Sequence, residues 1–190
     1  MRSPRYLALR KPAALLQTAL LALLSVGIDA AHASDASLEY RVRAAHLVNF
    51  TRYIEWPRNS GDLRICVLGT DFFGSTLNDV AADKIVNGRK IVVRRISTPA
   101  EGVSCHMVYL SMEGTNEARN TLKLLSSQGV LTVGEDADFL RIGGMIAFAP
   151  LDGKICFYIN AIAAENAGIH ISSRLKVLGR NLHDDGERRR

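Results

Sequence analysis

The chain has 190 residues with 24 Lys and Arg against 19 Asp and Glu, and its 47% hydrophobic and 23% charged content is that of an ordinary globular protein. This composition excludes collagen, coiled coil and disorder as descriptions of the whole chain. Four of the basic residues lie in the first 33 positions, and without these positions the net charge falls from +5 to +2. A broad phosphate-binding face is therefore not expected, and nucleic acid is not expected as a partner.

Residues 1–33 are predicted to be a signal peptide. Arg and Lys side chains precede a mostly apolar stretch over 13–28, and Ala31-His32-Ala33 provides a small-x-small cleavage site. The apolar stretch is shorter than the roughly 20 residues that a membrane-spanning helix needs. We expect cleavage near Ala33 and a mature protein in the bacterial periplasm; the alternative is an uncleaved N-terminal anchor.

The mature chain begins with a predicted helix over 38–56, which Pro57 ends because proline disfavours a helical conformation in the residue before it. Strands and helices then alternate. Asp152-Gly153 predicts a hairpin, and the last residues, 181–190, are polar and expected to be a disordered tail. The predicted strands are 63–68, 91–96, 105–110, 130–133, 145–149 and 154–159, and the predicted helices are 71–82, 117–127, 136–140, 161–167 and one from Ser172 or Ser173 to Leu178.

This alternation predicts one α/β domain over residues 34–180. Near-continuous apolar strands separated by helices are typical of a mostly parallel sheet, here of about five to six strands, with helices on both faces. The Asp152-Gly153 hairpin adds an antiparallel strand at one edge. In a doubly wound sheet the first three strands take the order 2-1-3.

Three cysteines remain after removal of the leader, so three pairings are open and one thiol is left over. The order 2-1-3 makes the strands of Cys66 and Cys105 neighbours, within reach of a disulfide. Three free thiols are the alternative. Cys156 lies in an apolar strand and is expected to be a buried thiol. No Cys-x-x-Cys motif is present, which argues against a thiol oxidoreductase.

No motif for catalysis, metal or cofactor binding is recognisable, so catalytic residues, metal and cofactors are all predicted to be absent. His170, Ser172 and Ser173 form the one candidate corner for binding an anion at a helix start. The simpler reading is that Ser172 or Ser173 caps the last helix. Trp56, the only tryptophan, is either a core anchor or an interface residue.

Over most of the predicted mature chain, the sequence resembles the YfiR-like family of periplasmic proteins. The resemblance extends from about Tyr40 to Leu178, and the segments that carry it are residues 44–57, 65–69, 87–89, 105–106, 133–134, 143–146, 157–160 and 168–178. It implies a repressor that binds the periplasmic sensor portion of an inner-membrane diguanylate cyclase and lowers cyclic di-GMP. An outer-membrane, peptidoglycan-associated lipoprotein is an implied second partner. A homodimer is a further expected association.

The resemblance also implies a disulfide between Cys66 and Cys105. The best-known member of the family has a second pair of cysteines, of which this sequence contains only Cys156, so a second bridge is not expected. A non-enzymatic regulator of this kind predicts an exposed apolar patch for the partner. The candidate residues are Trp56, Ile169, Ile171, Leu175 and Leu178. The alternative function is a single-lobe periplasmic receptor for a small anion or amino acid at His170, Ser172 and Ser173, and an enzyme is the least favoured reading.

Overall fold

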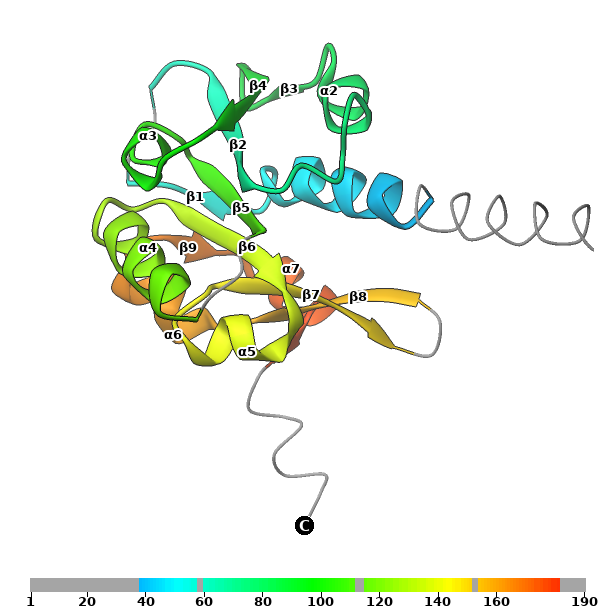
Figure 1. Ribbon diagram of the computed structural model, residues 1–190. Coiled ribbons are helices and arrows are strands. Elements are labelled where there is room, and N and C mark those ends of the chain that lie inside the picture. Colours follow the sequence, from blue (N-terminus) through cyan, green and yellow to red (C-terminus); the bar gives the residue numbers. More distant parts are fainter. Residues whose placement is uncertain (1–37, 58–59, 112–114, 152–153, 182–190) are drawn as a thin grey trace, which may run out of the picture. The chain divides into compact units, whose positions relative to one another are not determined.

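The computed structural model describes residues 38–57, 60–111, 115–151 and 154–181 (Figure 1). The predicted signal peptide over 1–33 and all but the first residue of the predicted tail over 181–190 lie outside these ranges. The compact unit that holds the fold begins at Glu39. Among the described residues, no helix combines the length and the apolar character needed to cross a membrane.

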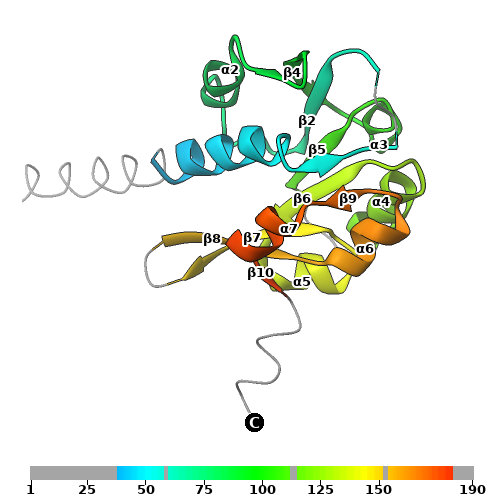
Figure 2. The same ribbon diagram turned by 180° about the vertical axis from the view of Figure 1, so that it is seen from behind.

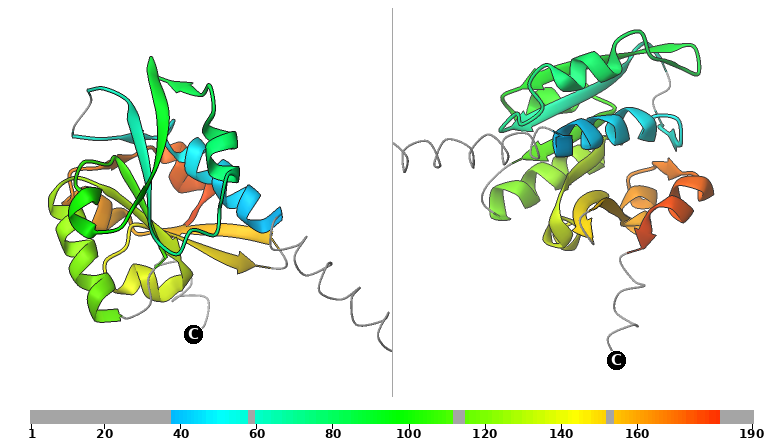
Figure 3. Two further views of the ribbon diagram at one scale, coloured as in Figure 1. Left: turned by 45° about the horizontal axis from the view of Figure 1, so that its top comes forward. Right: turned by 90° about the vertical axis from the view of Figure 1, so that its right-hand side faces the viewer.

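One large sheet organises the domain. Its strand order is β10-β8-β7-β6-β5-β2-β4-β3, and its strands twist strongly (Figure 3). The strands are β2 (Leu63–Gly69), β3 (Ile85–Val86), β4 (Arg89–Ile96), β5 (Met107–Ser111), β6 (Leu131–Glu135), β7 (Ile146–Leu151), β8 (Lys154–Ile159) and β10 (Arg180–Asn181).

The pairing confirms a mostly parallel α/β fold. Neighbouring strands are parallel except for the β7–β8 hairpin and the β3–β4 pair. The predicted order 2-1-3 is found as β4-β2-β5. The sheet has two more strands than expected, because β3 and β10 contain only two residues each and leave no periodic pattern in the sequence. As a result β10, and not the hairpin, forms one edge.

Helices cover both faces of the sheet, as expected. In Figure 1 the helices α4 and α5 lie in front of the sheet, and in Figure 2 the helices α6 and α7 do. The first face carries α3 (Pro99–Gly102), α4 (Thr115–Ser127) and α5 (Asp136–Arg141); the second carries the N-terminal helix, described over 38–50, with α2 (Thr76–Ala81), α6 (Ala161–Asn166) and α7 (Ser173–Leu178).

Side-chain alternation along β2 separates the two hydrophobic cores. Ile65 and Val67 pack into the core under the N-terminal helix. Cys66 and Leu68 point to the opposite core, under α4 and α5. Both sets are buried, because a central parallel strand is covered on each side. This explains why β2 is continuously apolar from Ile65 to Leu68 instead of alternating.

The predicted N-terminal helix is too long. It ends at residue 50, and β1 (Ile54–Glu55) follows as a strand. β1 pairs antiparallel with β9 (His170–Ile171) in a second, two-stranded sheet, with Ile54 opposite Ile171. The sequence resembles a continuing helix, but the pairing with a segment more than a hundred residues away satisfies its backbone groups as a strand instead.

The helix predicted over 71–82 is also shorter, since α2 begins at Thr76. The carboxylate of Asp71 accepts a hydrogen bond from the backbone N–H of Phe73 at 2.9 Å and holds a turn at this point. Phe73 is buried, whereas the neighbouring Phe72 is 49% exposed. The short strands β1, β3, β9 and β10 and the single-turn helix α3 were not predicted.

Candidate functional site

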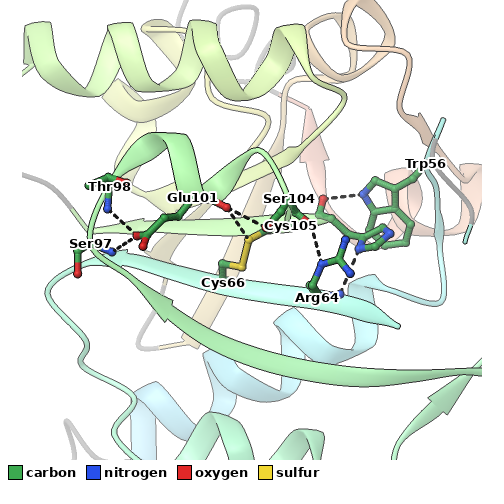
Figure 4. The surroundings of a disulfide bond; sticks show 9 residues. Trp56, Arg64, Cys66, Ser97, Thr98, Glu101, Ser104 and Cys105 are labelled. Carbon is green, nitrogen blue, oxygen red and sulfur yellow. Dashed lines mark hydrogen bonds between the residues drawn. A yellow bond between two sulfur atoms is a disulfide. The ribbon is translucent and has the colours of Figure 1, made fainter. Parts of the chain in front are cut away.

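A disulfide joins the two strands at the centre of the sheet. Cys66 in β2 and Cys105, two residues before β5, are bonded across a sequence separation of 39, with their Cα atoms 6.2 Å apart (Figure 4). Both cysteines are almost fully buried. The parallel pairing of β2 with β5 brings them together, so the pairing expected for Cys66 and Cys105 is the one that the structure contains.

The turn that leads into Cys105 is held by Glu101 of α3. The Glu101 carboxylate accepts hydrogen bonds from the backbone N–H groups of Ser97 at 2.7 Å and Thr98 at 3.0 Å (Figure 4). These bonds favour the charged form and lower the pKa of Glu101. The same contacts fix the start of α3, since Glu101 is the third helical residue after Thr98.

Residues on both sides of Cys105 are held by the polar groups of Arg64 and Trp56. The guanidinium of Arg64 donates to the Ser104 carbonyl at 2.6 Å, and the Arg64 backbone N–H donates to Nδ1 of His106 at 3.1 Å. The Trp56 indole donates to the His106 carbonyl at 2.8 Å and meets the imidazole edge to face, with ring centroids 5.7 Å apart. The buried disulfide is therefore flanked by hydrogen bonds that extend from buried Trp56 to exposed Glu101 and Ser104 (Figure 4).

The predicted partner-binding residues do not form an exposed patch. The exposed fractions of Trp56, Ile169, Ile171 and Leu175 are 8%, 1%, 1% and 2%. The expectation of an exposed patch is wrong for these four, because the β1–β9 pairing and the packing of α7 turn them into the core. Leu178 is exposed at 68%.

Val177, beside Leu178, is the most exposed of the large apolar side chains described, at 83%. We did not single it out from the sequence. The helical period places it on the face of α7 opposite Leu175, which was a usable signal. The exposed end of α7 thus presents two adjacent apolar side chains, Val177 and Leu178.

The predicted ligand corner at the start of α7 serves the helix itself. The hydroxyl of Ser172 accepts a hydrogen bond from the N–H of Leu175 at 3.3 Å, and Ser173 is the first residue of α7. His170 lies exposed in β9, opposite Glu55. These three side chains line neither of the two cavities described below. The capping alternative accounts for Ser172.

A cavity of about 390 Å³ lies between the N-terminal helix, β8 and α7. Its lining includes the guanidinium-bearing Arg52 and Arg180, and His46. His46 packs against the rings of Phe50, Phe148 and Phe157, and this burial lowers its pKa.

Cys156 also lines this cavity and is partly exposed, whereas we expected it to be buried. It carries a free thiol. The residue directly opposite Cys156 in the β7–β8 hairpin is Ala149, so no second cysteine faces it across the pair. No group of three His, Cys, Asp or Glu side chains in the described ranges is placed to hold a metal ion.

Comparison with known families gives a match to the YfiR/HmsC-like family model over residues 40–180. The chain belongs to the YfiR/HmsC-like family. The match covers the large sheet except for Asn181, and it includes both helical layers from Tyr40 onward. This family is regulatory, non-enzymatic and periplasmic, so the assignment supports a general role in cyclic di-GMP signalling. The buried disulfide is consistent with an oxidising compartment.

Three solved structures share only distant likeness with the chain. A conserved domain protein from Vibrio cholerae is 14% identical, with a TM-score of 0.44, over 62% of this chain and 54% of that one. An ABC domain in complex with L-Trp from Streptococcus pneumonia is 11% identical, with a TM-score of 0.49, over 73% and 59%. The putative oxidoreductase yvaA from Bacillus subtilis is 12% identical, with a TM-score of 0.34, over 60% and 35%. The chain thus spans less than two thirds of each.

Proposed function

We propose that the protein is a periplasmic repressor that binds the sensor portion of an inner-membrane diguanylate cyclase and thereby lowers cyclic di-GMP. The observation that carries this proposal is the family match over residues 40–180. The disulfide near the centre of the sheet is buried, and Trp56 and His106 are buried beside it. A rigid binding module fits these features.

The surface we assign to the cyclase is the exposed end of α7, with Val177 and Leu178. Apolar side chains surrounded by charged groups are typical of the centre of a protein interface. Lys176, which precedes Val177 in α7, is partly buried and forms an ion pair with Glu165 of α6 at 3.1 Å. The four buried candidates act indirectly, because Leu175 and the β1–β9 pair position α7 on the core.

The test is the intracellular level of cyclic di-GMP after deletion of the gene. Deletion should raise the level, and the wild-type gene should restore it. Leu178→Asp and Val177→Asp should fail to restore it while the melting temperature of the purified variants stays close to wild type. Ile162→Asp is the matched control, because Ile162 is 57% exposed on α6, outside the assigned surface.

An unchanged cyclic di-GMP level after deletion would remove the proposed function. Full complementation by Leu178→Asp and Val177→Asp would leave repression in place but move the interface elsewhere. Capture of the cyclase's sensor portion by the wild-type protein, and its loss with Leu178→Asp, would tie the effect to direct binding. No feature of the described residues bears on a lipoprotein partner or on a homodimer.

The alternative function, a single-lobe receptor for an anion or amino acid at His170, Ser172 and Ser173, has less support. The Ser172 hydroxyl is engaged by the N–H of Leu175. The three side chains also lie outside the lining of the neighbouring cavity.

A further inference from the structure

A second cavity, of about 380 Å³, lies at the carboxyl ends of the central parallel strands. Its lining includes Thr70 directly after β2, Ser111 at the end of β5 and Glu135 at the end of β6. β4, which follows β2 in the chain, pairs with one side of β2, and β5 pairs with the other side. The direction in which strands are added to the sheet therefore reverses between β2 and β5. Open α/β sheets bind their ligands in the crevice at this reversal.

Part of the lining of this carboxyl-edge cavity is aromatic and apolar. Tyr40 and Phe72 stack with ring centroids 5.2 Å apart and an angle of 20° between the planes. Phe139 contributes a third ring to the lining. Phe72 is 49% exposed although the neighbouring Phe73 is buried. An aromatic ring left half-exposed at the mouth of a cavity offers a surface on which a ligand can stack.

The charged side chains of the lining are all acidic: Glu135, Asp136 and Asp138. Two arginines compensate them in part, because Arg43 lies 3.6 Å from Glu135 and Arg141 pairs with Asp138. Arg43 is itself shared with Glu39, so negative charge remains in excess. The N-terminus of α4 at Thr115 adds a partial positive charge, which is smaller than that of one carboxylate.

The arrangement of these acids favours an extended cation over a metal ion. No three acidic, histidine or cysteine side chains in the described ranges converge closely enough to hold a metal. The Glu135 carboxylate already accepts hydrogen bonds from the hydroxyls of Tyr40 and Tyr109. Asp136 accepts the N–H of Phe139 at 3.0 Å. The Asp138 side chain is 78% exposed and its partner Arg141 is 70% exposed, so Asp138 can turn toward a ligand.

We propose that the carboxyl-edge cavity binds a small organic amine, whose apolar stem lies against Phe72 and Phe139 and whose cationic group faces the acidic side chains. Aromatic rings and carboxylates together recognise such cations, because the ring face and the carboxylate are both negative. This inference does not rest on the repressor function. The other cavity has the opposite charge, with Arg52 and Arg180 in its lining, and serves as an internal comparison.

The test uses three probes that share a phenyl ring and differ in charge: 2-phenylethylamine, 2-phenylethanol and 3-phenylpropionate. Binding to the exported, purified protein is measured by calorimetric titration and by the melting temperature, which a bound ligand raises by mass action. The amine should bind more tightly than the alcohol. The carboxylate should not compete with it.

Two surface variants locate the binding. Asp138→Asn and Phe72→Ala should each weaken binding of the amine roughly two- to five-fold, the loss expected for one exposed charge pair or one aromatic stacking contact. Asp79→Asn and Ile85→Ala are the matched controls, because both residues are exposed and lie outside the cavity. Equal affinity for amine and alcohol, absence of amine binding, or unchanged affinity in both cavity variants would each overturn the proposal.

Discussion

The indole N–H of Trp56 donates to the carbonyl of His106 at 2.8 Å, and His106 directly follows Cys105 in the chain. The only tryptophan of the protein is therefore bonded to the backbone next to the disulfide. Trp56 also lies one residue after β1, which pairs with β9 ahead of α7. The state of the disulfide is thus connected by a short run of contacts to the segment that positions α7.

Removal of the disulfide should lower the free energy of unfolding. The double variant Cys66→Ala, Cys105→Ala opens a loop with a sequence separation of 39, and the chain-entropy model gives an upper value of about 4 kcal/mol for such a loop. Urea denaturation of the oxidised proteins measures this difference. Cys156→Ala is the control, since Cys156 is free and partly exposed. An equal effect of the two changes would contradict a structural role for the bridge.

Trp56→Phe should lower the free energy of unfolding. The loss of the indole hydrogen bond accounts for about 1 kcal/mol of this decrease, and the smaller ring adds a further loss of packing. The change removes the indole donor, but the His106 carbonyl keeps a second hydrogen bond, from the N–H of Leu131 at 2.9 Å, so the loss stays moderate. A double-mutant cycle with the cysteine double variant, followed by circular dichroism in urea, measures the coupling between the two sites. Strict additivity would show that Trp56 and the disulfide stabilise the fold independently.

Stability should fall as the pH drops below 6.5, in part because of His46. Burial among phenylalanine rings lowers the pKa of His46 in the folded state below its ordinary value of 6.5. As the pH falls below 6.5, the unfolded chain takes up a proton that the folded chain resists, so stability is full above this pH and is lost as the pH falls toward the folded pKa. His46→Leu should flatten this dependence. His170→Gln, at an exposed position, should leave it unchanged, and an unaltered slope for His46→Leu would contradict the assignment.

Gly144→Ala should destabilise the protein by roughly 1–3 kcal/mol, the usual cost of overpacking. A Cβ atom at this position would lie 2.2 Å from the ring of Phe139 and 2.7 Å from its carbonyl oxygen. Phe139 cannot easily withdraw, because its ring also lies against Gly134 on the next strand. Gly88→Asn is the control, since its surroundings are open and asparagine tolerates the positive φ there. Thermal unfolding of the two variants makes the comparison, and similar melting temperatures would argue against this close packing.

The sequence pattern predicted the long central strands of the sheet but not the two-residue strands. Long apolar runs such as that of β2 are local signals, and the alternation with helices was sufficient to predict the β4-β2-β5 order and the neighbouring cysteine positions. Strands of two residues such as β1 and β9 have no period, and only their partners make them strands. The helix prediction over 38–56 therefore continued past residue 50, where a remote segment takes over the hydrogen bonding.

The candidate surface shows the same division. The sequence by itself determined the fold class, the family resemblance and the presence of several apolar side chains within residues 169–178, because these depend on local pattern and motif spacing. It did not determine which of those apolar side chains face solvent. Burial of Ile169, Ile171 and Leu175 and exposure of Leu178 were decided by how β9 and α7 pack onto the core. Hydrophobic free energy favours burial of an apolar side chain both inside the domain and against a partner protein. Only the tertiary structure shows which side chains are buried inside the domain and which remain exposed.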